Sequence, residues 1–463
     1  MFNSKVYINR RKELQEKVKN GVILFIGNEE SQVLIRDTFH KFRQNSNFLY
    51  YWGLNEPGLA ALIDVENDKE ILFGHDLTTE EIVWEGEQKK LVDKVKLIGV
   101  TETAEISSLK DVLLNFKKGK KQIHYLPQHM NDNIIKLSAL LNMHVDQVKG
   151  KYSAELREAV ISQRSVKSKK EIAEIEKALK ISYKLHTTAM RKTKPGKSEY
   201  EIVEIMEKIL ISKGSRWAYI PVFTIRGERL HNHHYTNKMQ KSNLVINDSG
   251  AESPIGLYSS DITRTFPVGG TFTKTQKEIY EIVLKSQLTA IAAIKPGVKY
   301  LDIHLITARI IAEGLNKLGI MKGDVDRAVE VGAHALFFPH GLGHMMGLDV
   351  HDMEDLGEDY IGYDDKIKRS DQFGLAYLRL AKELQFGYVL TVEPGIYFIP
   401  QLIKQWQSEN KFIEFINYNK ANEYLNFGGV RIEDNVLVTK NGYKVLGKPI
   451  PKTVKEIESL MKN

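Results

Sequence analysis

The 463-residue chain contains no cysteine. This absence excludes a disulfide framework, a thiolate metal site and a cysteine nucleophile. Any metal ion must therefore be held by nitrogen and oxygen ligands. The sequence also lacks a run of about 18 apolar residues, and its start, MFNSKVYINRRKEL, has no apolar stretch of signal-peptide length. We therefore expect no membrane association and a cytoplasmic location.

A large excess of charge of one sign is also missing, because 66 Lys and Arg residues stand against 59 Asp and Glu residues. The net charge of +7 comes with basic clusters at 117–121, 164–170 and 191–197 that are short, scattered and without neighbouring aromatic series. Nucleic-acid surfaces usually combine such features, so we expect no nucleic-acid partner. With 42% hydrophobic and 27% charged residues, the chain is predicted to be globular, with two or three domains.

The first third of the chain mixes short apolar runs with helical stretches. The runs 59–65 and 70–74 are separated by the turn residues END, which indicates a hairpin in an α/β domain. Near 150–170 the pattern becomes long, charged and helix-periodic, and Ser168 with Glu171 fits a capping box. We therefore predict domains at residues 1–160 and 168–463.

The second domain contains an internal repeat. AMRKTKPGKSEYEIVEIMEKIL from 189 and AIAAIKPGVKYLDIHLITARII from 290 both read as helix, Lys-Pro-Gly, helix, at an offset of 101 residues. Two such copies indicate an internal pseudo-twofold with a site between the halves.

Four carboxylates occupy strand positions that should be interior. LVINDSGA ends a strand at Asp248, and SSDITRTFPV begins the next with Asp261, while Glu393 and Glu433 lie in the apolar runs YVLTVEPGIYF and GGVRIEDNVLV. Carboxylates brought together repel one another unless a cation lies between them. Taken singly, each acid is more simply an exposed strand end or the partner of a Lys or Arg.

The segment PHGLGHMMGLDVHD, residues 339–352, adds three histidines and three glycines. Four carboxylates with one imidazole fit two divalent ions, Mn²⁺ first, with Zn²⁺ or Co²⁺ as alternatives, so we predict a dinuclear hydrolase. The glycines make a regular helix here unfavourable. A dinucleotide loop is the rival interpretation of GLGHMMG, but the spacing differs and the expected strand and later acid are missing.

Together, DSGAE…SSDITRTFPVGG, HGLGHMMGLDVHD, LTVEPGIYF and GGVRIEDN resemble the signature segments of pita-bread metallopeptidases that act on proline. These are Xaa-Pro aminopeptidase (aminopeptidase P) and Xaa-Pro dipeptidase (prolidase). FRQNSNFLYYWGLNEPG, residues 42–58, resembles their creatinase-type N-terminal domain. The implied fold class is α/β (α+β): a creatinase-type N-terminal domain followed by a pita-bread catalytic domain with its pseudo-twofold repeat.

The resemblance implies a set of five metal ligands: Asp248, Asp261, His344, Glu393 and Glu433. Asp261 and Glu433 would bridge two ions, Asp248 would complete one site, and His344 with Glu393 the other. A water shared by the ions, its pKa lowered to about 7, would be the nucleophile. Glu393 would also shuttle its proton to the leaving nitrogen.

The same resemblance assigns substrate-side residues. His340 and His351 would position the scissile carbonyl and stabilise its developing negative charge. A further family histidine is ambiguous in RLHNHHYTN: His231 follows leucine and His234 precedes tyrosine, and the spacing back from Asp248 favours His231. Arg431 is expected to steady the carboxylates and is a candidate for substrate contact.

Two departures from the family pattern bear on these expectations. The stretch from Asp248 to Asp261 is slightly longer than usual, which puts the form of the hairpin turn in doubt. The long segment between His351 and Glu393 resembles prolidases, and Arg379 falls on the arginine that they use against a dipeptide's carboxylate. The alternative for Arg379 is a helix-surface residue.

We therefore expect an Xaa-Pro aminopeptidase that acts on peptides with proline at the second position, with strict dipeptidase as the alternative. More remote alternatives are an inactive pita-bread binding protein, a creatinase-like amidinohydrolase and a methionine aminopeptidase. The resemblance also implies a homodimer or a larger homo-oligomer.

Overall fold

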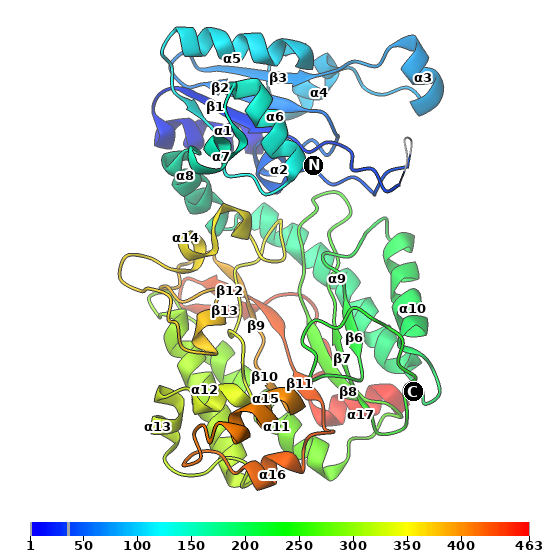
Figure 1. Cartoon of the computed structure of the whole chain (residues 1–463). Coiled ribbons are helices and arrows are strands. Elements are labelled where there is room, and N and C mark those ends of the chain that lie inside the picture. The colour runs from blue at the N-terminus through cyan, green and yellow to red at the C-terminus, as the bar shows by residue number, and fades with distance from the viewer. Residues whose placement is uncertain (1, 35–37, 463) are drawn as a thin grey trace. The chain divides into compact units, whose positions relative to one another are not determined.

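The structure, a computed structural model, describes residues 2–34 and 38–462. The chain divides into two compact units. The first takes the chain up to Arg164 together with Met353–Tyr360, and the second takes Ser165–Asp352 and the chain from Ile361 onward (Figure 1). The predicted boundaries, 1–160 and 168–463, stay a prediction about where independently folding domains begin and end.

The first unit is built on a five-stranded sheet in the order β4-β3-β2-β1-β5. Its strands are β1 (Val22–Ile26), β2 (Ala60–Asp64), β3 (Lys69–Gly74), β4 (Glu102–Glu105) and β5 (Ile123–His124). The predicted hairpin is confirmed, because β2 and β3 pair antiparallel across the END turn. Every residue of β1 and β2 is buried, which explains why these strands read as continuous apolar runs.

This unit also contains helices. They are α1 (Ser4–Val18), α2 (Ser46–Trp52), α3 (Thr79–Glu85), α4 (Leu91–Ile98), α5 (Leu109–Lys118), α6 (Asn131–Leu141), α7 (Val145–Gly150) and α8 (Ala154–Ser165). Of these helices, α3 buries none of its residues. Segment 353–360 joins this unit late in the chain: Asn47 Nδ2 donates to Asp355 Oδ2 over 3.1 Å, and the Arg157 guanidinium lies 3.3 Å from the Tyr360 ring centroid. The sequence did not predict this return.

Two helix pairs frame the second unit, α9 (Lys169–Lys192) with α10 (Glu199–Ser212) and α11 (Lys274–Ala293) with α12 (Tyr300–Lys317). Each pair is joined at a Lys-Pro-Gly turn, and both turn glycines have φ of +85° or +90°, a left-handed conformation that favours glycine. The expected capping box is also present, because Ser168 N donates to Glu171 Oε2 over 2.9 Å. Both predictions are confirmed.

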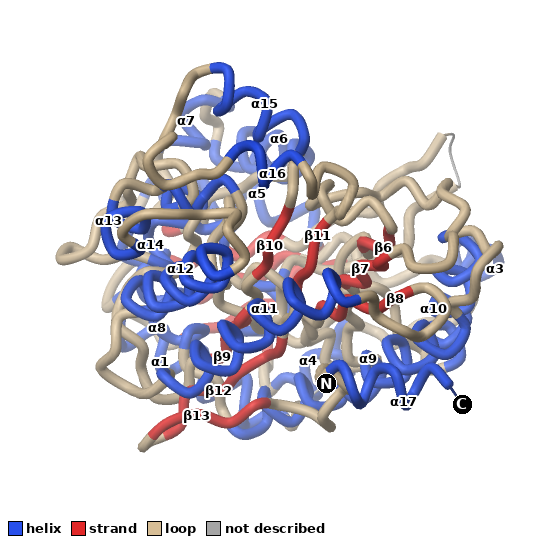
Figure 2. The backbone as a smooth tube through the Cα atoms, turned by 90° about the horizontal axis from the view of Figure 1, so that it is seen from below, coloured by secondary structure: helices blue, strands red, loops and turns tan. Residues whose placement is uncertain are grey.

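The strands of the second unit lie between these helix pairs, as the two perpendicular views show (Figures 1 and 2). One sheet has the order β6-β7-β8 and another the order β13-β12-β9, while β10 pairs with β11. The strands are β6 (Val222–Thr224), β7 (Leu244–Asp248), β8 (Thr263–Pro267), β9 (Val389–Val392), β10 (Gly395–Tyr397), β11 (Gly429–Arg431), β12 (Asp434–Thr439) and β13 (Gly442–Val445).

Shorter helices complete the chain: α13 (Val325–Glu330), α14 (Glu358–Gly362), α15 (Pro400–Ser408), α16 (Tyr418–Asn422) and α17 (Val454–Lys462). The glycine-rich segment 339–352 forms no helix, as its composition predicted. Among the described residues, no helix is long and apolar enough to cross a membrane.

Candidate metal centre and active site

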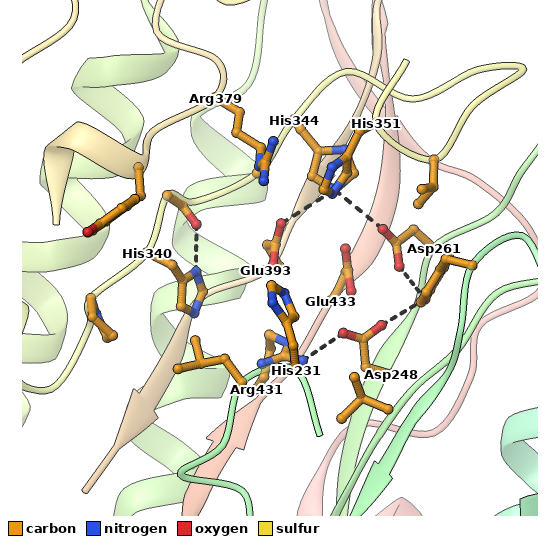
Figure 3. Close-up of a pocket in the computed structure, with 18 of the residues that line it drawn as sticks. His231, Asp248, Asp261, His340, His344, His351, Arg379, Glu393, Arg431 and Glu433 are labelled. Carbon is orange, nitrogen blue, oxygen red and sulfur yellow. Dashed lines mark hydrogen bonds and ion pairs between the residues drawn. The ribbon is translucent and has the colours of Figure 1, made fainter. Parts of the chain in front are cut away.

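Strand ends bring together the four carboxylates that the sequence singled out, Asp248, Asp261, Glu393 and Glu433 (Figure 3). Asp248 is the last residue of β7 and pairs in register with Thr263 of β8, so Asp261 lies just beyond the same hairpin end. Glu393 directly follows β9, and Glu433 directly precedes β12. Because Asp434 pairs with Val392, the two glutamates also lie at one end of their sheet.

Hydrogen bonds between the two sheets hold these ends together. Thr263 Oγ1 donates to Glu433 Oε2 over 2.7 Å, and Glu433 N donates to Thr263 O over 3.0 Å. The Asn435 side chain makes two hydrogen bonds to the backbone of Asp261. Its Oδ1 accepts from Asp261 N, and its Nδ2 donates to Asp261 O. All four residues are buried, so solvent does not compete for these bonds.

His344 joins the carboxylates from the glycine-rich segment. Its backbone N donates to Thr391 Oγ1 over 3.0 Å, and Thr391 N donates to His344 O, which fixes the segment against β9. The ring Nδ1 lies 3.1 Å from Met345 O, a pure acceptor, and so carries the proton. The lone pair of Nε2 therefore faces Asp261 Oδ2 at 3.3 Å and Glu393 Oε1 at 3.6 Å.

This arrangement fits a bound cation. One ligand atom from each of Asp261, His344 and Glu433 lies within 4.8 Å of the others, and Glu433 Oε1 is buried with no hydrogen-bond partner among the described residues. Burial, reinforced by the charges of Asp261 and Glu393, raises the pKa of Glu433 well above its usual value. Burial also raises the pKa of Glu393 to about 7. Divalent ions would reduce the repulsion between the carboxylates and would bind the free oxygen of Glu433.

Two further side chains steady the aspartates. The Tyr219 hydroxyl lies 2.7 Å from Asp248 Oδ1 and 2.5 Å from Asp261 Oδ1, and its single proton can serve one of them at a time. Burial, followed by the charges of these two aspartates, raises the pKa of Tyr219 well above its usual value. Arg431 Nη2 donates to Asp248 Oδ2 over 2.6 Å, so Arg431 contacts the carboxylates as the sequence suggested.

His340 is held at both ring nitrogens. Its Nδ1 donates to Gly341 O over 2.8 Å, and its Nε2 accepts from the Tyr397 hydroxyl over 2.9 Å. Burial, followed by the charge of Arg431, lowers the pKa of His340 to about 3, so the ring is neutral. Donation of a hydrogen bond from His340 to a substrate would require one of these contacts to break.

His351 lies beside the metal-ligand candidates. Its ring centroid is 4.2 Å from that of His344, and both rings face the same space (Figure 3). Among the described residues, the group that could hold an ion consists of Asp261, His344 and Glu433, and it includes neither His351 nor the candidates Asp248 and Glu393. The position of His351 is therefore compatible with a contact to substrate next to the metal centre.

These groups line one cavity of 680 Å³. All but one of the residues singled out from the sequence line it, namely His231, Asp248, Asp261, His340, His344, His351, Arg379, Glu393, Arg431 and Glu433. All three histidines of this segment are exposed, but only His231 and His233 line the cavity, with ring centroids 6.4 Å apart, whereas His234 does not. Burial lowers the pKa of His231.

Comparison with known protein families settles where the chain belongs. A family model described as metallopeptidase family M24 matches residues 173–440, and one described as aminopeptidase P, N-terminal domain, matches residues 7–124. The chain belongs to metallopeptidase family M24. The predicted family and the two-part fold, an aminopeptidase P-type N-terminal domain followed by an M24 catalytic domain, are thereby confirmed.

Two curated relatives of this M24 chain carry different names. It is 33% identical to the Xaa-Pro dipeptidase of Homo sapiens, over 98% of this chain and 92% of the relative. It is 34% identical to a probable Xaa-Pro aminopeptidase of Fusarium vanettenii, over 100% of this chain and 97% of the relative. The M24 chain is thus a metallopeptidase of the group that includes Xaa-Pro aminopeptidases and dipeptidases.

Solved structures resemble the M24 chain over its full length. Aminopeptidase PepP of Pseudomonas aeruginosa aligns with a TM-score of 0.83 at 28% identity, covering 100% of this chain and 98% of that one. Zinc-substituted Escherichia coli aminopeptidase P in complex with product aligns with a TM-score of 0.82 at 30% identity, with the same coverage.

Sequence reasoning missed several residues of the site. Tyr219 lies in RWAYIPVF, where nothing distinguishes its hydroxyl from that of any half-buried tyrosine. His233 was passed over in favour of its neighbours, although three histidines in four positions signalled the segment. Asn435 stands two residues after Glu433, and a polar residue inside the apolar strand DNVLVT was the available signal.

Proposed function

We propose that the chain is a dinuclear exopeptidase that hydrolyses the N-terminal Xaa-Pro bond of peptides, in the manner of an Xaa-Pro aminopeptidase. The observation that carries this proposal is the convergence of four carboxylates and His344 on one cavity, in which Glu433 Oε1 is buried and has no hydrogen-bond partner in the part of the chain that the structure describes. Such a site is costly without cations, and its ligand types suit Mn²⁺ first, with Zn²⁺ or Co²⁺ as alternatives.

Asp248, Asp261, His344, Glu393 and Glu433 would hold two ions per chain. When bound, such ions lower the pKa of water to about 7 and polarise a carbonyl group. Glu393 would accept a proton and pass it to the proline nitrogen that leaves. Arg431 holds Asp248 in place, and Asn435 holds the backbone of Asp261, so the ligand set is preorganised.

The histidines would act on the substrate side. His351 lies next to His344 and would donate a hydrogen bond to the scissile carbonyl, stabilising the charge that develops there. Between the two candidates left open by the sequence, we assign this side of the cavity to His231, because His234 lies outside it. His340 was expected on the substrate side too, and it would contact a substrate there by releasing either Gly341 O or the Tyr397 hydroxyl.

Acceptance of peptides longer than two residues is supported by the mouth of the cavity. Ile220 and Tyr377 line the cavity, yet they are 64% and 57% exposed, so the cavity reaches solvent there. A residue that follows proline can extend toward this mouth. The volume of 680 Å³ is in the range of sites that enclose drug-sized ligands.

Strict dipeptidase activity is the second candidate, and Arg379 supports it. Arg379 lines the cavity, and its guanidinium is directed toward the metal-ligand candidates (Figure 3). The helix-surface alternative for Arg379 therefore does not describe this structure. A guanidinium in this place suits the carboxylate of a C-terminal proline through charge-assisted hydrogen bonds.

Paired substrates test the two candidates. The Mn²⁺-loaded protein should cleave Xaa-Pro-Yaa tripeptides and Xaa-Pro dipeptides, and it should leave matched Xaa-Ala peptides intact. If Arg379 pairs with the dipeptide carboxylate, Arg379→Ala should lower kcat/KM for dipeptides by about 10- to 150-fold, equivalent to about 1.5 to 3 kcal/mol. Tripeptide hydrolysis should remain nearly unchanged.

Arg309→Ala is the matched control, because Arg309 pairs with Glu313 on the exposed face of α12. Hydrolysis of dipeptides alone by the wild-type protein would replace the aminopeptidase proposal with the dipeptidase one. Equal losses on both substrates in Arg379→Ala, or no loss on either, would contradict the carboxylate-clamp role. Failure to cleave any Xaa-Pro bond with Mn²⁺, Zn²⁺ or Co²⁺ would reject the proposed function as a whole.

The remaining expectations belong to the same proposal. A homodimeric or larger assembly stays a prediction that follows from the resemblance, and a cytoplasmic location stays one that follows from the lack of long apolar runs in the sequence. Size-exclusion chromatography with light scattering tests the assembly.

A further inference from the structure

A buried ion pair lies behind the histidines of the candidate site. Lys167 Nζ is 2.8 Å from Asp352 Oδ2, and each side chain is only 1% exposed. The partners are 185 residues apart in sequence. Lys167 comes directly before the capping residue of α9, and Asp352 directly follows His351.

Asp352 closes the loop that carries both His344 and His351. Asp352 N donates to Met345 O over 3.0 Å, and Asp352 Oδ1 accepts from Asp349 N over 3.3 Å. The carboxylate lies inside the loop so closely that a Cβ on Gly347 would be 2.4 Å from Oδ2. The direction of this carboxylate therefore sets the path of the backbone around His351.

Lys167 also connects this loop to the strand that leads to Glu393. The backbone N of Lys167 donates to Gly387 O over 2.8 Å, just before β9, and Gly387 N donates to Val438 O of β12. Lys167 Nζ also lies 3.5 Å from Ser165 O. One lysine thus connects the histidine loop with the β9–β12 sheet, whose ends carry Glu393 and Glu433.

The energetics of such a pair favour a positioning role. Burying two charges costs about as much as their attraction returns, and an apolar pair of similar volume often stabilises a fold equally well. An ion pair adds direction, because a charge-assisted hydrogen bond constrains both partners in angle as well as distance. Catalytic groups need such directional support, since small displacements of a reacting group lower the rate strongly.

We propose that Lys167 and Asp352 are a positioning pair that sets the orientation of His351 beside His344. The inference rests on the proposed function, because it assigns the pair to the substrate-side role given there to His351. Neither Lys167 nor Asp352 lines the cavity, so both act through the loop and not on the substrate.

The decisive experiment combines the pair with His351. Lys167→Met should lower kcat on an Xaa-Pro substrate by about 10-fold or more, with little change in KM and both metal equivalents retained. In a His351→Ala background, Lys167→Met should cause little additional loss, because the group it positions is already gone. Lys167→Arg keeps the cation and should recover part of the rate.

A second variant separates stability from positioning. Lys167→Met alone removes the cation beside the buried Asp352 carboxylate, whereas Lys167→Met with Asp352→Asn removes both charges. The double variant should unfold at a temperature close to that of the wild type while its kcat stays low. Lys444→Met is the control, because Lys444 pairs with Glu176 on the surface of the same unit and should change neither value.

Full activity in the double variant would overturn the proposal and leave the pair a purely structural element. Equal, additive losses from Lys167→Met in the wild-type and His351→Ala backgrounds would also overturn it. These outcomes differ from a failure of the proposed function, which would appear as absence of Xaa-Pro hydrolysis in the wild-type protein itself.

Discussion

Neutral and cationic side chains contact the carboxylates of the candidate metal centre. Arg431 pairs with Asp248, the Tyr219 hydroxyl reaches both aspartates, and Thr263 donates to one oxygen of Glu433. These contacts compensate only part of the negative charge, because the other oxygen of Glu433 stays buried and finds no hydrogen-bond partner in residues 2–34 and 38–462. The residues are therefore arranged for cations, which would complete the charge balance.

Asp261→Asn tests this charge balance at a carboxylate that contacts both Tyr219 and His344. The change removes the charge of a proposed bridging ligand while keeping its size, so neither ion should be held correctly. We expect a loss of activity of at least ~10³-fold and a reduced metal content measured by plasma emission spectrometry. Asp326→Asn, at an exposed position of α13, is the control. Near-normal turnover, or full activity after exhaustive chelation, would reject the metal-ligand role.

His351→Ala tests the division between metal ligands and substrate-side histidines. If His351 contacts the substrate or transition state without binding metal, kcat should fall by roughly 10²-fold or more while both ions remain bound. Steady-state kinetics and metal analysis on the same preparation measure both quantities. Loss of one metal equivalent would place His351 among the ligands.

At the scale of elements, the glycine-rich segment must lie directly against β9. Leu342 O accepts from Glu393 N over 2.8 Å, and His344 exchanges hydrogen bonds with Thr391. A Cβ at Gly343 would lie 2.2 Å from Thr391 O, a backbone atom that cannot move away alone. The glycine therefore permits the approach that places His344 beside Glu393.

Gly343→Ala should force the segment away from β9. We expect a loss of stability of about 1 to 3 kcal/mol from overpacking and a fall in activity of about 10²-fold, because His344 and Glu393 would separate. Gly442→Ala is the matched control: no atom lies within 4 Å of its added Cβ, and its φ is not positive. Thermal unfolding and kinetics of the two variants measure the difference. Equal stability and equal activity of the two variants would show that the segment tolerates the displacement.

At the scale of the whole molecule, buried neutral histidines link stability to pH. His304 on α12 is fully buried, its ring stacks 5.2 Å from Phe338, and neither ring nitrogen has a hydrogen-bond partner among the described residues. Burial, with smaller effects of His334 and His340, lowers its pKa to about 3. The unfolded chain has a histidine pKa of about 6.5, so it binds the proton more readily than the folded one.

The stability that His304 contributes is therefore complete above pH 6.5 and is lost as the pH falls toward 3. At pH 5 the expected loss is about 2 kcal/mol from this residue. Wild type and His304→Gln should be unfolded thermally at pH 7.5 and pH 5, both with chelator so that metal release does not contribute. The decrease in Tm should be smaller in His304→Gln. Equal decreases in both proteins would show that His304 does not carry the effect.

Sequence periodicity predicted the elements whose signals are local. The β2–β3 hairpin, the Ser168–Glu171 capping box and the two helix, Lys-Pro-Gly, helix units each depend on residues a few positions apart. The four carboxylates at strand positions and the histidine cluster could be singled out in the same way, whereas the choice of His344 as the fifth ligand came from the resemblance of short motifs to those of a known family. The family and fold class could be predicted for the same reason.

Only the tertiary structure decided which distant groups meet. His231 and His233 line the cavity while His234 does not, because the path of the loop, and not its composition, directs each ring. The pairing of Lys167 with Asp352 spans 185 residues, and the return of 353–360 to the first unit has no local signal. Such contacts depend on how separate elements pack, so the sequence determined the elements and the chemistry of their ends, and packing decided their partners.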